Sequence, residues 1–249
     1  MAPYRNLKDK ELARDGGRFI AESENVVRRL LASATPVESV LVAERKLGAI
    51  GPLVPADRPV YVADDALIER IIGFEFHSGV LACGVRPKSP ALESVVPASP
   101  RPALIVVCQQ ITNTENLGSL IRVSAAFGAD AMVLGERCCD PYFRQSVRVS
   151  MGTIFSLPIV RSENLVRDLD AMKSLGVENI AAVLDAEAEA LNAIDVRARV
   201  AVAFGNEADG LDGETIGHCD RRVTIPMKRG TDSLNVAVAA AVFLYQLTR

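Results

Sequence analysis

The feature that most constrains the fold is a series of apolar segments in the second half of the chain. The segments are ALIVVCQ (103–109), AMVLG (131–135), SLPIV (156–160), NIAAVLD (179–185), VAVAFG (200–205) and RRVTIPM (221–227). Helical patterns cover 117–127 and 165–175 between them. Near-continuous apolar strands that alternate with helices favour a parallel sheet covered on both faces. We therefore expect an α/β domain, closed by an apolar helix over 233–247 that is buried in its own core or against a second subunit.

The prolines divide the chain into two parts. Five of the 13 prolines lie within residues 87–102, which predicts an extended, semi-rigid linker. Before it, β-branched runs at 39–44, 59–64 and 79–85 alternate with helical patterns at 25–31 and 66–72. We therefore expect a small α/β domain over 1–86, the linker over 87–102 and a larger domain over 103–249.

Composition excludes several classes of protein. The chain has 249 residues, of which 49% are hydrophobic and 24% charged, so it is not disordered. The longest apolar run, 236–245, is too short to span a membrane, and the N-terminus lacks the apolar core of a secretory signal. Five cysteines without C-x-x-C spacing and two histidines argue against a disulfide framework and a metal site. We expect a cytoplasmic protein with reduced thiols and no metal.

The overall charge gives no sign of a nucleic-acid-binding protein. The formal net charge is −3, which is unlike a protein that coats nucleic acid through bulk positive charge. A local basic site remains compatible with this balance.

Polar loops follow three of the predicted strands. They read QITNTENLGSLIR after the first strand, GNEADGL after VAVAF and KRGTDSLN after RRVTIPM. Ligands bind beyond the carboxyl ends of the strands in open parallel sheets, so these loops are the candidate site. No G-x-G-x-x-G or P-loop pattern follows the first strand, which leaves a Rossmann dinucleotide site without support.

These loops carry a family resemblance. NTENLGSLIRVSAAFGAD, VAFGNEADGL and IPMKRGTDSLNVAVAAAV, in that order, resemble the three motifs of the SpoU (TrmH-like) ribose methyltransferases of the SPOUT superfamily. The matching positions are Asn116, Gly118 and Arg122 in the first motif, Gly205, Glu207, Gly210 and Leu211 in the second, and Ser233, Leu234 and Asn235 in the third. The resemblance covers 102–249, and it implies a C-terminal trefoil knot.

The resemblance also implies the chemistry. It indicates transfer of a methyl group from S-adenosyl-L-methionine to a ribose 2′-hydroxyl of RNA. Arg122 would act at the hydroxyl, either as a base or as an electrostatic stabiliser, and the sequence leaves both roles open. The other implied catalytic residues are Asn116, Glu207, Ser233 and Asn235; the implied cofactor-binding residues are Gly205, Ile225 and Leu234; and the candidate phosphate-binding residues are Arg144, Arg148, Lys228 and Arg229.

The N-terminal part resembles a second family feature. ARDGGRFIAESENVVRRLL, VESVLVAE and HSGVLACGV are similar to the ribosomal-protein-like RNA-binding domain that precedes many SpoU catalytic domains. This resemblance favours ribosomal RNA over tRNA as substrate, and we expect a homodimer through the catalytic domain. The alternatives are a tRNA ribose methyltransferase and an RNA-binding relative that has lost catalysis.

Overall fold

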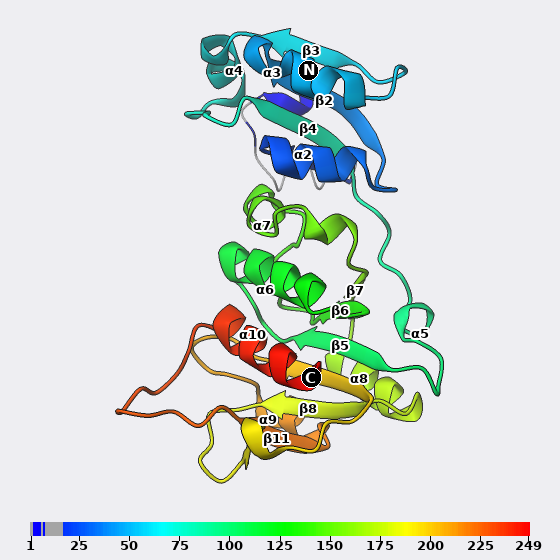
Figure 1. The fold of residues 1–249 in the computed structure, drawn as a ribbon, viewed down its shortest axis with the longest axis vertical. Helices are drawn as coiled ribbons and strands as arrows, with labels where there is room; N and C mark the ends of the chain where they lie inside the picture. The colour runs from blue at the N-terminus through cyan, green and yellow to red at the C-terminus, as the bar shows by residue number, and fades with distance from the viewer. Residues whose placement is uncertain (1, 6, 8–16) are drawn as a thin grey trace. The chain divides into compact units, whose positions relative to one another are not determined.

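The computed structural model of the chain describes residues 2–5, 7 and 17–249 (Figure 1). Residues 13–16, at the start of the N-terminal resemblance, lie outside the described part. The chain forms two compact units. The first contains Met1–Lys88 and Asp140–Ser156, and the second contains Ser89–Cys139 and Leu157–Arg249.

The first unit is built on a mixed four-stranded sheet. Its strands are β1 (Arg18–Glu22), β2 (Val37–Ala43), β3 (Val60–Ala63) and β4 (Val80–Val85), in the spatial order β1-β4-β2-β3. β4 is antiparallel to both of its neighbours, and β2 and β3 are parallel. The helices of this part are η1 (Ala2–Tyr4), α2 (Glu24–Leu31), α3 (Glu44–Ile50), η2 (Gly51–Leu53) and α4 (Asp65–Ile72).

A buried tyrosine ties this sheet to the start of the chain. The hydroxyl of Tyr4 donates to the main-chain oxygen of Ser39 at 2.8 Å and accepts from the main-chain nitrogen of Cys83 at 3.1 Å. Tyr4 is fully buried beside Ile20 and Leu41. A buried phenol is stable only when its polar end is hydrogen-bonded, so these bonds fix residues 2–5 onto the sheet.

A segment from the middle of the sequence completes the first unit. Residues 140–156 contain α7 (Arg144–Val149) and η3 (Thr153–Phe155). The ring of Phe19 on β1 lies 5.1 Å from that of Tyr142 and 5.7 Å from that of Phe155, between ring centroids. The first unit is therefore assembled from two separate stretches of sequence.

The second unit has a seven-stranded parallel sheet. The strands are β5 (Ala103–Cys108), β6 (Ala131–Leu134), β7 (Ile159–Arg161), β8 (Glu178–Ala182), β9 (Glu189–Ala190), β10 (Arg199–Phe204) and β11 (Arg221–Thr224), in the order β7-β6-β5-β10-β8-β11-β9. Every pairing is parallel. The expected α/β class with a parallel sheet is confirmed. The two-residue strand β9 was not expected.

Helices cover both faces of this sheet (Figure 1). They are α5 (Leu92–Val95), α6 (Thr114–Ala126), α8 (Leu165–Ser174), η4 (Leu191–Ala193), α9 (Gly213–Gly217) and α10 (Val236–Leu247). Ile105 and Val107 of β5 share a core with Leu169 and Met172 of α8. On the other face α6 packs against α10, and the Phe204 ring meets that of Phe243 edge-on. Successive strand residues point to opposite faces, so fully apolar strands serve two helical layers.

The proline-rich stretch is more ordered than the sequence predicts. It contains the short helix α5, and Leu92 and Val96 are buried in the core of the second unit. The bond between Ser99 and Pro100 is cis. Apolar side chains between the prolines therefore anchor the stretch.

The final helix is shorter than expected. It begins at Val236, with Asn235 as its N-cap, whereas the predicted helix began at residue 233. Val238, Val242 and Tyr245 leave one face exposed. No helix in the described part of the chain combines the length and apolar character needed to cross a membrane.

Gly84 gives a test of the packing in the first unit. A Cβ added to Gly84 on β4 would lie 2.4 Å from the ring of Phe19, which the aromatic contacts hold in place. We expect Gly84→Ala to lower the free energy of unfolding by about 1–3 kcal/mol, the usual cost of overpacking. Urea unfolding followed by circular dichroism measures the change.

Gly48→Ala is the matched control, because Gly48 lies in α3 with open space around it. Alanine should stabilise this helix by about 0.5–1 kcal/mol. Equal stability of the two variants would contradict the rigid packing assigned to Phe19.

Candidate functional site

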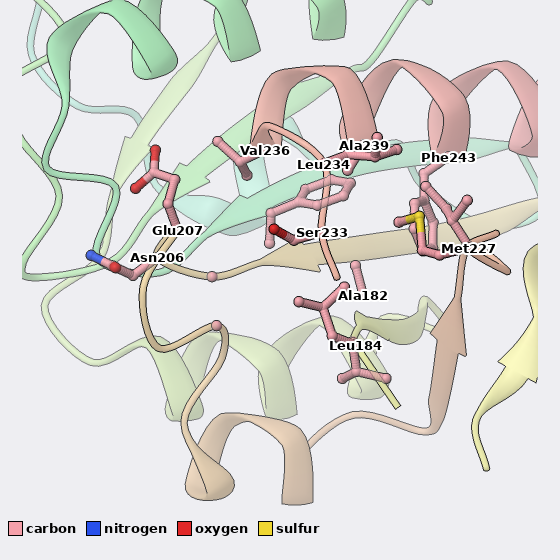
Figure 2. Close-up of a pocket in the computed structure, with 15 residues that line it drawn as sticks. Ala182, Leu184, Asn206, Glu207, Met227, Ser233, Leu234, Val236, Ala239 and Phe243 are labelled. Carbon is pink, nitrogen blue, oxygen red and sulfur yellow. The ribbon is translucent and has the colours of Figure 1, made fainter. Parts of the chain in front are cut away.

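A pocket opens at the carboxyl ends of β8, β10 and β11 in the second unit. It encloses about 590 Å³, open solvent at its mouth included. Figure 2 shows Ala182 and Leu184 on one side, and Val236, Ala239 and Phe243 of α10 on the other. The remaining lining residues are Val183, Phe204, Gly205, Asn206, Glu207, Gly210, Ile225, Met227, Ser233 and Leu234.

The pocket brings together residues from two of the three sequence motifs. Gly205, Ile225 and Leu234, which the resemblance assigns to cofactor binding, all line it. Glu207 and Ser233 also line it. Most of the other lining side chains are apolar, so the few polar groups set the orientation of any ligand.

Gly205 is required by a close approach of the main chain. A Cβ at Gly205 would lie 2.0 Å from the carbonyl carbon of Gly210 and 2.3 Å from the nitrogen of Leu211. Asn206 and Gly210 close this turn with reciprocal main-chain hydrogen bonds of 3.1 and 2.8 Å. Gly210 has a φ of 69°, in the region that favours glycine. The two glycines therefore let the turn fold back on itself and present Glu207 at the pocket.

Gln109 fastens the far end of the same turn to the sheet. Its buried amide donates to Asp212 Oδ2 at 2.7 Å and to Thr215 Oγ1 at 2.6 Å, and its Oε1 accepts from the Asp212 nitrogen at 2.9 Å. The pKa of Asp212 is lowered, first by the N–H of Thr215 and then by the amide of Gln109, with smaller contributions that include the charge of Arg137. Asp212 therefore stays ionised and caps α9.

Three motif residues form a directed chain of hydrogen bonds. Asn235 Oδ1 accepts from the nitrogens of Ala237 and Val238 at the start of α10. Its Nδ2 then donates to Asn116 Oδ1 at 2.9 Å. Asn116 Nδ2 in turn donates to Glu207 Oε1.

The helix cap fixes the direction of this chain. Because Asn235 must turn its oxygen to the helix, its NH₂ faces Asn116, and the NH₂ of Asn116 faces Glu207. Glu207 Oε1 is thereby held as an acceptor. Among the described residues, this bond engages one carboxylate oxygen and leaves the second available to a ligand.

Arg122 is not joined to this network. It lies on the exposed surface of α6 and does not line the pocket. In a helix, six residues turn the chain by about 600°, so Arg122 projects about 240° around α6 from Asn116. Within the described residues, its guanidinium makes no hydrogen bond or ion pair.

The candidate phosphate-binding residues fall in two places. Lys228 and Arg229 are exposed in the loop between β11 and α10, which also carries Ser233 and Leu234. Arg144 and Arg148 lie on α7 in the first unit, where both approach the carboxylate of Glu22. Arg144 also stacks on the ring of Phe74, 4.2 Å from its centroid. Its guanidinium is thus already engaged by the protein.

Sequence reasoning missed several pocket residues. Asn206 stands between the motif residues Gly205 and Glu207, and its position inside the motif was a usable signal. Ala182 ends β8 and Leu184 follows it, in a segment with no motif. Ala239 and Phe243 look like ordinary core positions of an apolar helix. Their place in the pocket becomes visible only in the tertiary structure.

The cysteines take no visible part in the site. Burial raises the pKa of the Cys108 and Cys138 thiols, which disfavours the reactive thiolate. None of the five cysteines forms a disulfide bond. Among the described residues, no group of three or more His, Cys, Asp or Glu side chains is arranged to hold a metal ion.

The comparison with known families decides the family. A sequence model of the SpoU rRNA Methylase family matches residues 103–245, more than half of the chain. The chain belongs to the SpoU family. The resemblance inferred from the three motifs is therefore confirmed, and with it the class of enzyme, an RNA methyltransferase.

Individual relatives agree with the SpoU assignment. A protein of Mycobacterium tuberculosis named "Uncharacterized tRNA/rRNA methyltransferase" is 37% identical over 235 residues, covering 92% of this chain and 80% of the relative. The 23S rRNA (guanosine-2′-O-)-methyltransferase RlmB of Xanthomonas axonopodis pv. citri is 35% identical over 158 residues, covering 64% of this chain and 63% of RlmB. A solved RNA 2′-O ribose methyltransferase superposes with a TM-score of 0.78 at 29% identity, covering 96% of this chain and 93% of that one.

Asn235→Asp separates helix capping from the SpoU network. Aspartate caps a helix as well as asparagine does, so the free energy of unfolding should stay within about 1 kcal/mol of wild type. It offers no donor to Asn116, and it adds a carboxylate beside the Asn116–Glu207 pair. We expect methyl transfer to RNA to fall about 10²-fold. The measurement is incorporation of labelled methyl groups, paired with thermal unfolding.

Asn235→Ala serves as the comparison, because it loses both the cap and the donor. It should be about 1 kcal/mol less stable and also inactive. Wild-type activity of Asn235→Asp would show that the bond to Asn116 has no part in the site.

Proposed function

We propose that this protein transfers a methyl group from S-adenosyl-L-methionine to a ribose 2′-hydroxyl of RNA, and that its substrate is ribosomal RNA. The observation that carries the proposal is the pocket lined by Gly205, Ile225 and Leu234, with Glu207 held at its edge by Asn116. The names of the relatives add support, since RlmB methylates 23S rRNA and others are named tRNA/rRNA methyltransferases. The alternatives of a tRNA substrate and of an inactive RNA-binding relative are decided by the tests below.

The pocket fits the methyl donor. Main chain around Gly205 and Ile225 offers hydrogen bonds to adenine, and Leu234 and Phe243 supply apolar contact. When bound, the sulfonium supplies a methyl group that is already activated for transfer. The protein therefore needs to orient the nucleophile and accept its charge.

The polar network supplies the orientation. Asn116 and Asn235 hold Glu207 so that one carboxylate oxygen remains available to the ribose or to an approaching cation. Ser233 lines the same pocket with an exposed side chain. Groups fixed in this way need no reorganisation during the reaction, which is the main advantage of a preorganised site.

Arg122 is assigned to the developing charge. A guanidinium stays protonated at neutral pH, so it is a poor base and a good partner for an alkoxide or a phosphate. No carboxylate neutralises Arg122 among the described residues, so its charge is free to act on RNA. Lys228 and Arg229, exposed beside the pocket-lining residues of their loop, are assigned to the RNA backbone, and so is the exposed Arg148. Arg144 is not assigned there, because Glu22 and the ring of Phe74 already hold its guanidinium.

Further features belong to the same proposal. The exposed face of α10 formed by Val238, Val242 and Tyr245 is the surface through which we expect a homodimer. Residues 1–86 form the RNA-recruiting domain, and residues 103–249 form the catalytic domain with its trefoil knot, on the strength of the family resemblance. A cytoplasmic location suits five cysteines that form no disulfide bond.

The substrate class is tested in total RNA. Mapping 2′-O-methyl positions in cells with and without the protein should reveal a site in ribosomal RNA that disappears with the gene. A lost site in tRNA would replace the ribosomal substrate by tRNA. Loss of no site at all would favour the inactive relative.

Arg122→Ala tests the catalytic assignment. We expect single-turnover methyl transfer to fall about 10²–10³-fold, because one stabilising contact to developing charge is lost. Affinity for S-adenosyl-L-methionine should stay within a few-fold, since Arg122 does not line the pocket. Arg122→Lys keeps the charge and loses the planar fork, so it should be impaired as well. Near-normal turnover by Arg122→Ala would refute the assignment.

Ala239→Phe tests the cofactor pocket. Ala239 lines the pocket from α10, so a phenyl ring there fills space assigned to the methyl donor. Calorimetry should show at least about tenfold weaker binding of S-adenosyl-L-methionine. Ala241→Phe, on the same helix but outside the pocket lining, is the control and should bind normally. Unchanged binding by Ala239→Phe would place the cofactor elsewhere.

A further inference from the structure

Gln110 has a strained main chain beside the proposed active site. It is the second residue after β5, and its φ of 55° lies in the left-handed region that residues with a side chain rarely adopt. Such a conformation persists only where surrounding contacts hold it. One contact is visible in the main chain, because the Gln110 oxygen accepts from Asn206 Nδ2 at 3.1 Å. The strained residue is thereby tied to the turn that presents Glu207.

The side chain of Gln110 holds an arginine. With its oxygen toward Arg137, the amide accepts from Nε at 3.0 Å and from Nη1 at 3.1 Å. The opposite orientation would set an NH₂ group against a guanidinium, two donors with no acceptor between them. Gln110 therefore joins Arg137 to Asn206 through one residue.

Arg137 keeps its positive charge available. Two other arginines of the second unit are paired with carboxylates, Arg221 with Glu189 and Arg222 with Asp185. Arg137 is exposed, and its hydrogen-bond partner is the neutral amide of Gln110. Asp212 is near enough to sense the charge of Arg137, but its oxygens are bound by Gln109 and Thr215.

The position of Arg137 suits a ligand at the pocket. It lies in the loop after β6, and β6 pairs with β5 in the parallel sheet. The ends of parallel strands meet at one edge, so Arg137 belongs to the same edge as the loops that carry Asn116 and Glu207. A neutral acceptor orients the guanidinium without neutralising it, which is what a fixed site for an anion requires.

We infer that Arg137 binds a backbone phosphate of the substrate RNA and that Gln110 is its positioning residue. The inference rests on the proposed function only in taking RNA as the substrate. It adds a phosphate contact that none of the three motifs contains. The main-chain oxygen of Gln110 also accepts from Asn206, so Gln110 connects Arg137 to the turn that bears Glu207.

The first test measures the salt dependence of RNA binding by the full chain. The probe is deproteinised ribosomal RNA in a filter-binding assay. Arg137→Ala should bind about tenfold more weakly at low salt, and the slope of log affinity against log salt should decrease by about 0.7–0.9, the value of one phosphate contact. Arg137→Lys should keep the slope, because the charge remains.

The matched control is Arg101→Ala. Arg101 is exposed in the same unit but lies two residues before β5 begins, at the opposite edge of the sheet. It should bind RNA like wild type with an unchanged slope. An equal loss in the two alanine variants would reduce the effect to general charge and overturn the inference.

The second test uses the strain at Gln110. Gln110→Gly relieves the left-handed conformation and keeps the carbonyl that binds Asn206, so the unfolding temperature should stay within a few degrees of wild type. It removes the acceptor of Arg137, so RNA binding should weaken about threefold. In the Arg137→Ala background the same substitution should have no further effect, because coupled residues are not additive. Additive losses would overturn the positioning role.

The two levels of the proposal fail in different ways. If the wild-type protein binds S-adenosyl-L-methionine and methylates RNA while Arg137→Ala keeps the full salt slope, the phosphate contact is wrong and the function stands. If the wild-type protein methylates no RNA, the proposed function fails, whatever the salt slopes of the variants are.

Discussion

The close approach of Gly205 to Gly210 is the constraint on which the rest of the site depends. The space beside Gly205 admits no side chain, since the neighbouring main chain would lie 2.0 Å from a Cβ. The turn therefore folds flat against the end of β10 and opens the pocket on one side. It also lifts Glu207 to the pocket edge, where Asn116 reaches it from α6. A side chain at Gly205 would disturb the pocket and the carboxylate together.

The orientation of that carboxylate originates in secondary structure. A helix start leaves main-chain N–H groups without partners, and Asn235 satisfies two of them. Its remaining donor then dictates the orientation of Asn116 and so of Glu207. The same asparagine thus begins the last helix and sets the polarity of the site, which explains why the Ser-Leu-Asn motif stands immediately before an apolar helix.

Much of the fold follows from periodicity. Six apolar segments were expected as strands of the second unit, and each contains a strand of the parallel sheet. The two-residue strand β9 has too little sequence to show a pattern. The segment 140–156 carries no signal that it packs with the first unit, because Phe19, Tyr142 and Phe155 are far apart in sequence. The sequence also did not predict which residue caps α10, since Ser233 and Asn235 are both good capping residues.

The spacing of the motifs predicted the residues that line the pocket better than it predicted which arginines are available to bind RNA. Gly205, Ile225 and Leu234 share one cavity because each sits at or beyond a strand end. Whether an arginine can bind RNA depends on which groups neutralise its charge, and the sequence does not show those contacts. Arg144 is paired with Glu22, whereas the hydrogen bonds of Arg137 within the described residues go to the amide of Gln110. A chain with a net charge of −3 can therefore present a locally positive surface to RNA, provided that its carboxylates form ion pairs with other arginines.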